Sequence, residues 1–304
     1  MKFSKTHLAI LLLISANIIW GGGPPIFKWA FENVHTFTLA FLRYFIPVVI
    51  MIVLFPNYLY MAKKDLLKVM AASFFGITVN IGLYFIAIHY TASINAAIIA
   101  SAGPAFLILL SIFFLKEHPT RKMLVGNLIG LTGVLLIVLE STSKMNAGSS
   151  LFGNILLVIS TIGSVINVII AKEVIKKYHA ITITFWTFLF GTISFYPFLL
   201  WESSKYGFLT NLNFQGIFGI LYGALLTSFF AWFVFFWALK HMSASSTAVF
   251  DYIQPVVSVI VAIPLVHEIP NAFFLIGASL VIGGMYFAEN HKSHPHLHHI
   301  MMRK

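Results

Sequence analysis

The chain has 304 residues, of which 59% are hydrophobic and only 9% are charged. Soluble domains carry about one-quarter charged residues, so this chain lacks the polar surface that a water-soluble protein needs. Its 19 lysines and arginines outnumber its 9 acidic residues, but they lie between apolar runs and form no basic patch. The composition therefore excludes a soluble enzyme or a nucleic-acid-binding protein and indicates a protein embedded in a lipid bilayer.

Ten apolar runs cover most of the chain, and each is long enough to cross a hydrocarbon core of about 30 Å as a helix. The first run begins with basic residues, as a signal peptide does, but no small-residue cleavage site precedes Trp20, so we interpret it as a retained helix. The predicted fold class is an all-α integral membrane protein of ten transmembrane helices. The predicted spans are residues 7–27, 35–55, 68–89, 93–115, 122–139, 151–171, 181–201, 214–239, 244–266 and 272–288.

The distribution of lysine and arginine predicts how these spans are oriented. Fifteen basic residues fall in the termini and in alternate loops on one side, whereas only Lys28, Lys144 and Lys205 fall on the other side. Because basic loops are retained in the cytoplasm, we expect both termini on the cytoplasmic side of the cell membrane. Termini on one side require an even number of spans, which agrees with ten.

The two halves of the chain repeat one another at a constant offset of 151 residues. Each half holds five spans, an odd number, so the second half must be inverted relative to the first. Inverted repeats are the architecture of alternating-access transporters, in which the solute site lies near the middle of the membrane between the repeats. We expect repeats at residues 1–143 and 144–290 and a histidine-rich cytoplasmic tail at residues 291–304. The matched pairs are Ala87 and Ala238, Ala97 and Ala248, Pro104 and Pro255, Glu117 and Glu268, Pro119 and Pro270, Gly126 and Gly277, and Gly133 and Gly284.

Each half has a proline in its fourth span, Pro104 or Pro255, then a Glu-x-Pro loop and a glycine-rich fifth span, and Arg43 lies within the second span. This pattern resembles the drug/metabolite transporter superfamily, in its ten-span branch built from two EamA-type domains. The resemblance implies a basket of helices whose central cavity is lined by spans 1, 3, 4, 6, 8 and 9. It also implies solute export by a rocking motion that bends at the two prolines. One departure is Asp251, whose counterpart in the first half is Ala100.

The first span contains Asn17 and Trp20, about one helical turn apart, and then a Gly-Gly-Gly-Pro-Pro run at residues 21–25. Glycines and prolines disfavour a regular helix, so we expect the span to break or end there. Backbone groups freed inside a membrane are tolerated where they line a wet cavity, which makes Asn17 and Trp20 candidate solute contacts. The alternative is a simple exit of the helix into the next loop.

Two further spans carry polar residues at helical spacing. Asn80 and Tyr84 lie four residues apart in the third span, and Asn167 follows Ser160 by two turns in the sixth. Such residues either hydrogen-bond a neighbouring helix or line a cavity. Because amides suit a polar zwitterion better than an apolar drug, we regard Asn80, Tyr84 and Asn167 as candidate solute contacts, together with Trp232 in the eighth span.

Asp251 is the only acidic residue deep within a span. A carboxylate at that depth must face the protein interior and be paired or protonated. It is therefore the candidate proton-coupling site and a candidate contact for a solute ammonium, with Tyr252 beside it; a structural hydrogen bond is the alternative. Arg43 is the obvious counter-ion, but its depth leaves roughly 10 Å between the two charges. Because the resemblance implies that such an arginine is usual in this span of the family, we favour a role for Arg43 in orienting groups or in setting the potential of the cavity over contact with a solute carboxylate.

Cofactors and protein partners leave little signature in the chain. The absence of cysteine excludes disulfides, thiolate nucleophiles and iron–sulfur clusters, and the histidines of the spans sit at span ends, so we expect no cofactor and no metal site. The histidine-rich tail is interpreted as a solvated segment, with binding of a divalent metal by its imidazoles as the alternative. Gly126, Gly130, Gly277 and Gly284 predict close helix packing within the bundle, with a homodimer seam as the alternative.

These observations together predict a secondary transporter rather than an enzyme. The chain has no Walker loop, so the driving force would be a solute gradient or protons. The leading hypothesis is export of a small polar metabolite, above all an amino acid. The alternative is uptake or exchange of a nucleoside-like cofactor such as S-adenosylmethionine, stacked on Trp20 or Trp232. An intramembrane hydrolase would need a second carboxylate or a deep histidine, and the spans offer neither.

Overall fold

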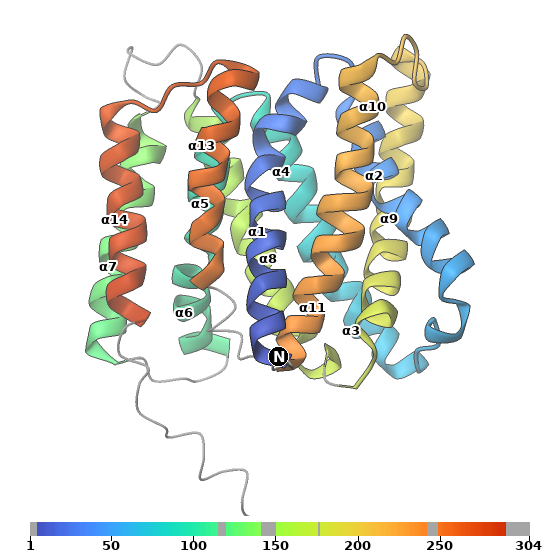
Figure 1. The fold of residues 1–304 in the computed structure, drawn as a ribbon, viewed down its shortest axis with the longest axis horizontal. Coiled ribbons are helices and arrows are strands. Elements are labelled where there is room, and N and C mark those ends of the chain that lie inside the picture. Colours follow the sequence, from blue (N-terminus) through green and yellow to red (C-terminus); the bar gives the residue numbers. More distant parts are fainter. Residues whose placement is uncertain (1–4, 115–119, 141–149, 176, 242–248, 290–304) are drawn as a thin grey trace, which may run out of the picture.

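The computed structural model describes residues 5–114, 120–140, 150–175, 177–241 and 249–289, and within these ranges the chain is helical and has no β-strand. The helices pack side by side in one bundle (Figure 1). The α-helices are α1 (Lys5–Ala30), α2 (Thr36–Leu54), α3 (Lys63–Ser73), α4 (Asn80–Ile88), α5 (Ser93–Ser101), α6 (Gly103–Phe114), α7 (Arg121–Glu140), α8 (Leu151–Ile175), α9 (Ala180–Tyr206), α10 (Phe214–Leu221), α11 (Ala231–His241), α13 (Ile253–Val266) and α14 (Ala272–Glu289).

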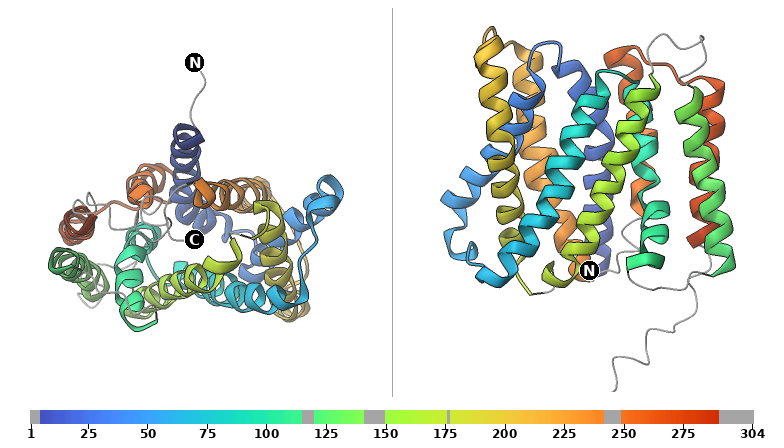
Figure 2. Two further views of the ribbon diagram at one scale, coloured as in Figure 1. Left: turned by 90° about the horizontal axis from the view of Figure 1, so that it is seen from below. Right: turned by 180° about the vertical axis from the view of Figure 1, so that it is seen from behind.

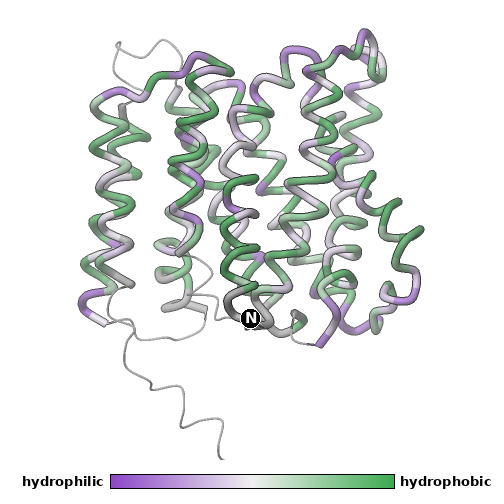
Figure 3. Tube along the Cα trace, in the orientation of Figure 1, coloured by the Kyte–Doolittle hydropathy of each residue, from purple (hydrophilic) through white to green (hydrophobic). Residues whose placement is uncertain are grey.

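Apolar residues dominate the helices, whereas hydrophilic residues gather at the ends of the bundle (Figure 3). Among the described residues, seven helical segments are long and apolar enough to cross a membrane, and two shorter apolar helices accompany them. The chain is thus an all-helical membrane protein, and the count of ten spans with cytoplasmic termini stays a prediction. The predicted domain boundary at residues 143 and 144, the tail at 291–304 and the Glu117 loop lie outside the described residues.

The first helices of the two halves run in opposite directions. α1 begins at one face of the bundle, which we call the N-terminal face, and ends at the opposite face (Figure 1). α8 starts at the opposite face, where the Ser150 N–H donates to the Tyr90 carbonyl (2.8 Å) at the end of α4. It ends at the N-terminal face, where Lys177 pairs with Asp65 of α3 (3.0 Å). α8 is therefore antiparallel to α1, its counterpart at the offset of 151 residues.

Irregular backbone occurs at matching places in the two halves. A π-helical segment, η2 (Phe74–Val79), joins α3 to α4, and a second one, η3 (Tyr222–Phe230), joins α10 to α11. Shifted by the repeat offset, η2 coincides with the last six residues of η3. The next segment is also interrupted in each half, at Ala102 between α5 and α6 and at Tyr252, where the 3₁₀ turn η4 (Val249–Tyr252) meets α13.

The expected break at residues 21–25 is wrong. α1 is continuous over its whole length, with both prolines inside it. The glycines of this run permit close approach of another helix, because a Cβ on Gly21 would lie only 2.7 Å from the carbonyl oxygen of Gln254 on α13. Packing against α13 stabilises the helix although the prolines remove two N–H donors.

Helices α7 and α14 pack against each other along their glycines at one edge of the bundle (Figure 2). A Cβ on Gly284 would lie 2.5 Å from the Gly130 backbone nitrogen and 2.6 Å from the Gly126 carbonyl oxygen. A Cβ on Gly277 would lie 2.6 Å from the Ile137 side chain. The predicted close packing of helices within the bundle is confirmed, because the glycine faces of α7 and α14 contact each other within one chain.

Replacing Gly284 with alanine should destabilise the protein, because the added methyl group meets backbone atoms that have little freedom to move. Overpacking of this kind costs about 1–3 kcal/mol, which a melting curve in detergent would register as a lower Tm. Gly283→Ala is the matched control, since nothing lies within 4 Å of a Cβ at that position. Equal Tm values for the two variants would contradict the packing described above.

Candidate functional site

A cavity of about 270 Å³ lies between the two halves of the bundle. Its lining comes from α1, α4, α5, α6, α8, η3, α11, η4 and α13, which belong to the spans that the family resemblance implies, and from Arg43 on α2. Six of the eight predicted solute contacts line it: Trp20, Asn80, Tyr84, Asn167, Trp232 and Asp251. The cavity therefore brings together predicted contacts that lie up to 231 positions apart in the sequence.

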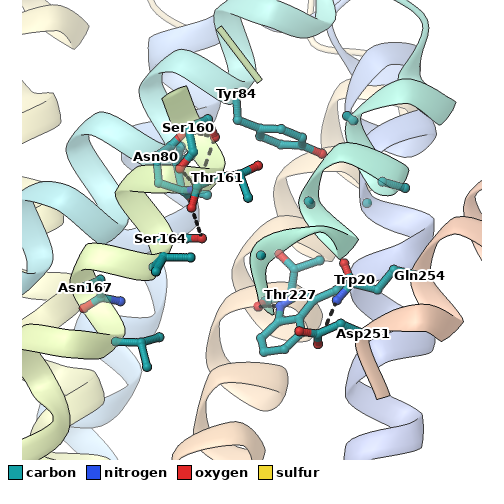
Figure 4. A pocket seen from close by; sticks show the side chains of 18 of the residues that line it. Trp20, Asn80, Tyr84, Ser160, Thr161, Ser164, Asn167, Thr227, Asp251 and Gln254 are labelled. Carbon is teal, nitrogen blue, oxygen red and sulfur yellow. Dashed lines mark hydrogen bonds between the residues drawn. The ribbon is translucent and has the colours of Figure 1, made fainter. Parts of the chain in front are cut away.

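One wall of the cavity is polar and is formed by α4 and α8 (Figure 4). The Asn80 side-chain amide donates to the Ser160 carbonyl (2.8 Å) and hydroxyl (3.1 Å), and the Ser160 hydroxyl donates to the Asn80 carbonyl (2.8 Å). The Asn167 side chain packs closely against Gly76 of η2. A Cβ added to Gly76 would clash with this side chain. Asn80 thus joins two helices and also faces the cavity. It directly follows η2, and π-helical segments are frequent at functional sites.

The facing wall carries the aromatic and acidic residues (Figure 4). The Trp20 indole N–H donates to the Thr227 carbonyl (2.9 Å), and its ring meets that of Trp232 edge to face, with the centroids 6.2 Å apart. Asp251 lies on η4, and its carboxylate accepts a hydrogen bond from the Gln254 side chain at 3.3 Å. The hydrogen bonds and ring contacts position both an aromatic surface and a carboxylate toward the cavity.

Asn17 and Tyr252 are absent from the cavity lining. Asn17 is 1% exposed, donates to the Leu13 carbonyl (3.0 Å) and accepts a hydrogen bond from Gln254 (2.7 Å). Its contact is therefore with Gln254, which also reaches Asp251. Sequence reasoning missed Gln254, although it follows Asp251 by three residues and so shares its side of the helix.

Arg43 reaches the cavity from α2, and its side chain is 4% exposed. Its Nε–H donates to the Ser228 hydroxyl (2.9 Å), and its guanidinium carbon lies 5.1 Å from the centroid of the Phe27 ring. The ion pairs formed among the described residues join Lys28 to Glu268 and Lys177 to Asp65, and Arg43 takes part in neither. The structure thus places in the cavity a cation to which sequence reasoning gave an orienting role.

The two predicted hinge prolines differ in their surroundings. Pro104 lies at the start of α6 and lines the cavity, whereas Pro255 is buried in α13 and is not among the lining residues. Their role in bending stays a prediction.

A second polar cluster ties the helices together at the opposite face. Glu268, between α13 and α14, accepts hydrogen bonds from the N–H groups of Ser93 (2.9 Å) and Ile94 (3.2 Å) and from the Ser93 hydroxyl (2.7 Å). It also pairs with Lys28 of α1 (2.8 Å), which donates to the Thr91 carbonyl (2.8 Å). One carboxylate therefore caps α5 and links the ends of α1 and α13 to it.

His89, beside this cluster, has a lowered pKa, because burial and then the nearby Lys28 charge both disfavour its protonated form.

Within the described part of the chain, no three histidine, cysteine, aspartate or glutamate side chains gather closely enough to hold a metal ion. The described residues thus form a polar and aromatic cavity that carries one carboxylate and one guanidinium.

Comparison with known proteins identifies the family of this chain. The chain is 28% identical to an "Uncharacterized transporter" of Archaeoglobus fulgidus, over 95% of this chain and 99% of that protein. It is 26% identical to an "S-adenosylmethionine uptake transporter" of Rickettsia conorii, over 91% of each chain. A solved crystal structure shares the fold with a TM-score of 0.66 at 17% identity, covering 92% of this chain and 95% of that one. The model of the EamA-like transporter family matches residues 7–139 and again residues 151–289, so the chain is a transporter that belongs to this family.

Proposed function

We propose that the protein exports a small zwitterionic metabolite, an amino acid above all, across the cell membrane by alternating access. The observation that carries this proposal is the central cavity, whose lining combines a carboxylate, amides and two tryptophans from both halves of the chain. Its volume of about 270 Å³ lies just below the roughly 300–1,000 Å³ of sites for drug-sized ligands. An amino acid suits this size better than a drug does.

The polar groups of the cavity support a zwitterion in particular. Asp251, held by Gln254, offers a negative charge to a solute ammonium. Asn80 and Asn167 offer amide donors and acceptors on the facing wall. Inside a membrane such groups interact strongly, because the surrounding medium screens charge poorly.

S-adenosylmethionine is the second candidate solute. Its support is the name of the Rickettsia relative and the edge-to-face pair of Trp20 and Trp232, whose rings suit an adenine. The cavity volume of about 270 Å³ lies near the lower end of the range for ligand sites, which favours the smaller amino acid. Direction of transport distinguishes the two candidates as well, because the relative is named for uptake.

Alternating access requires contacts that close one face while the other opens, and the cluster around Glu268 provides such contacts. It connects α1 of the first half with the end of α13 in the second half, and it caps α5 between them. We propose that this cluster breaks when the cavity opens to the face at which the cluster lies, the face that the lysine distribution predicts to be outside the cell. Pro104 and Pro255 are the proposed bending points.

The solute can be tested by a melting screen in detergent with amino acids, nucleosides and S-adenosylmethionine, followed by counterflow in proteoliposomes. A ligand at about 100 times its Kd stabilises the folded state by about 2.7 kcal/mol, so we expect one class of amino acid to raise the Tm and to exchange in counterflow. A response to S-adenosylmethionine alone would replace the leading candidate by the second. Absence of counterflow for every compound would contradict a metabolite carrier.

Proton coupling through Asp251 can be tested with the same vesicles. Asp251→Asn should abolish stimulation of flux by a pH gradient while the protein stays folded, because the amide cannot release a proton. Glu32→Gln is the control, since Glu32 is an exposed acid that contacts Gln215 far from the cavity. A pH dependence that persists unchanged in Asp251→Asn would exclude this residue as the coupling site.

The Glu268 cluster can be tested by hydrogen–deuterium exchange. Glu268→Gln removes the charge that Lys28 contacts, so exchange should rise together at the end of α1, the start of α5 and the α13–α14 connection. Glu202→Gln is the matched control, because Glu202 caps α2 in the same way, through the Phe37 and Thr38 N–H groups (3.1 and 2.6 Å). If exchange rises only at α5, Glu268 is a local helix cap and not a closing contact.

A further inference from the structure

Arg43 is a buried cation at the edge of the candidate site. Its guanidinium carbon lies 5.1 Å from the ring centroid of Phe27, 5.4 Å from that of Tyr44 and 5.7 Å from that of Phe85. These rings come from α1, α2 and α4, so aromatic surfaces of three helices surround the guanidinium. The same side chain lines the cavity while being only 4% exposed.

The contacts that the protein makes leave this charge incompletely compensated. A guanidinium has five N–H donors, and the hydrogen bond that the described residues accept from Arg43 uses Nε alone, to the Ser228 hydroxyl. No carboxylate of the described chain forms an ion pair with it. Cation–π contacts replace only part of the hydration that a buried ion loses.

Asp251 is too far along the bundle to be the missing counter-ion. Asp251 contacts Gln254, which contacts Asn17 of α1, whereas Arg43 lies on Phe27 of the same helix. Ten residues separate these two positions of α1, a rise of about 15 Å along the helix axis. The charges of Arg43 and Asp251 therefore lie at different depths along the bundle axis within one cavity.

We propose that Arg43 binds the carboxylate of the transported solute, an inference that rests on the transport function proposed above. The two terminal nitrogens of a guanidinium match the two oxygens of a carboxylate in a bidentate pair. The rings of Phe27 and Phe85 exclude water from such a pair. A phosphate is a poorer match, because a dianion would meet one cation and otherwise neutral residues.

This assignment also determines how the solute is oriented within the cavity. A solute whose carboxylate contacts Arg43 has its remaining groups directed toward the amides of α4 and α8. An ammonium of the same solute contacts Asp251 only where the two charged groups are well separated in the molecule, because Asp251 lies nearer the N-terminal face. Ser228 acts as a positioning residue, because its hydroxyl accepts from Nε and so fixes the plane of the guanidinium.

The test compares amino acids with their carboxamides, which have nearly the same shape but lack the negative charge of the group that Arg43 would bind. For the purified full-length protein we expect the acids of one class to raise the Tm and their carboxamides and inorganic phosphate to leave it unchanged. Arg43→Gln should weaken the acid by at least tenfold in Kd. Arg43→Lys and Ser228→Ala should weaken it less, because a point charge or a reoriented guanidinium still attracts the anion.

Lys205→Gln is the matched control, since Lys205 is an exposed cation on α9 that stacks on Trp201 outside the cavity. It should bind the acids as the unaltered protein does. Equal Tm shifts for acid and carboxamide, or an undiminished acid response in folded Arg43→Lys, Arg43→Gln and Ser228→Ala, would overturn the inference. Counterflow of a solute without an anionic group would overturn it too, while leaving the transport function intact.

Discussion

Inside a hydrocarbon layer every backbone N–H and C=O group needs a partner within the protein, and this requirement decides where the chain can depart from a regular helix. Such departures are tolerated where they are buried in protein or line a cavity. Here they occur at η2, η3, η4 and the interruption at Ala102, and all four adjoin residues that line the central cavity. The architecture of the site thus follows from the solvent in which the protein folds.

The repeat doubles these departures, and the chain then makes them unequal. The two π-helical segments coincide at the offset of 151 residues, so each half contributes to the cavity an irregular segment from its third span. Ala100 and Asp251 are equivalent by the same offset, and both line the cavity. Two similar halves therefore enclose a space whose carboxylate comes from one half only, which is what recognition of an asymmetric solute needs.

Sequence patterns predicted the parts of the fold that depend on periodicity and small residues. The all-helical class follows from the length of the apolar runs, and the α7–α14 contact follows from glycines that leave room for backbone approach. The polar stripe of Asn80 and Asn167 lies on the cavity because helical spacing fixes which residues share a face.

The incorrect and missing predictions share a cause, which is that a neighbouring helix decides the outcome. Residues 21–25 stay helical because α13 packs against Gly21, and no local propensity reveals that contact. Asn17 falls behind the cavity wall because Gln254 lies between it and Asp251. The place of Arg43 in the cavity depends on the direction of a long side chain, which depth along the helix does not determine.

Buried charges in this protein are held by different means at different levels. At the opposite face Glu268 is neutralised by Lys28 and by the N-terminal N–H groups of α5, an arrangement in which helix dipole and ion pair act together. In the cavity Arg43 has aromatic rings and a hydroxyl instead. A charge that is fully paired stabilises a closed state, whereas one that lacks an ionic partner is suited to bind a ligand.

Exposure of one cavity position to both faces of the membrane in turn is the central claim, and cysteine labelling measures it most directly. The chain has no cysteine, so Ala100→Cys, an exposed position in the cavity lining, would carry the only thiol. In oriented vesicles we predict that a membrane-impermeant thiol reagent labels it from either face, at rates that a transported solute changes in opposite directions. Labelling from one face alone, whatever solute is present, would contradict alternating access.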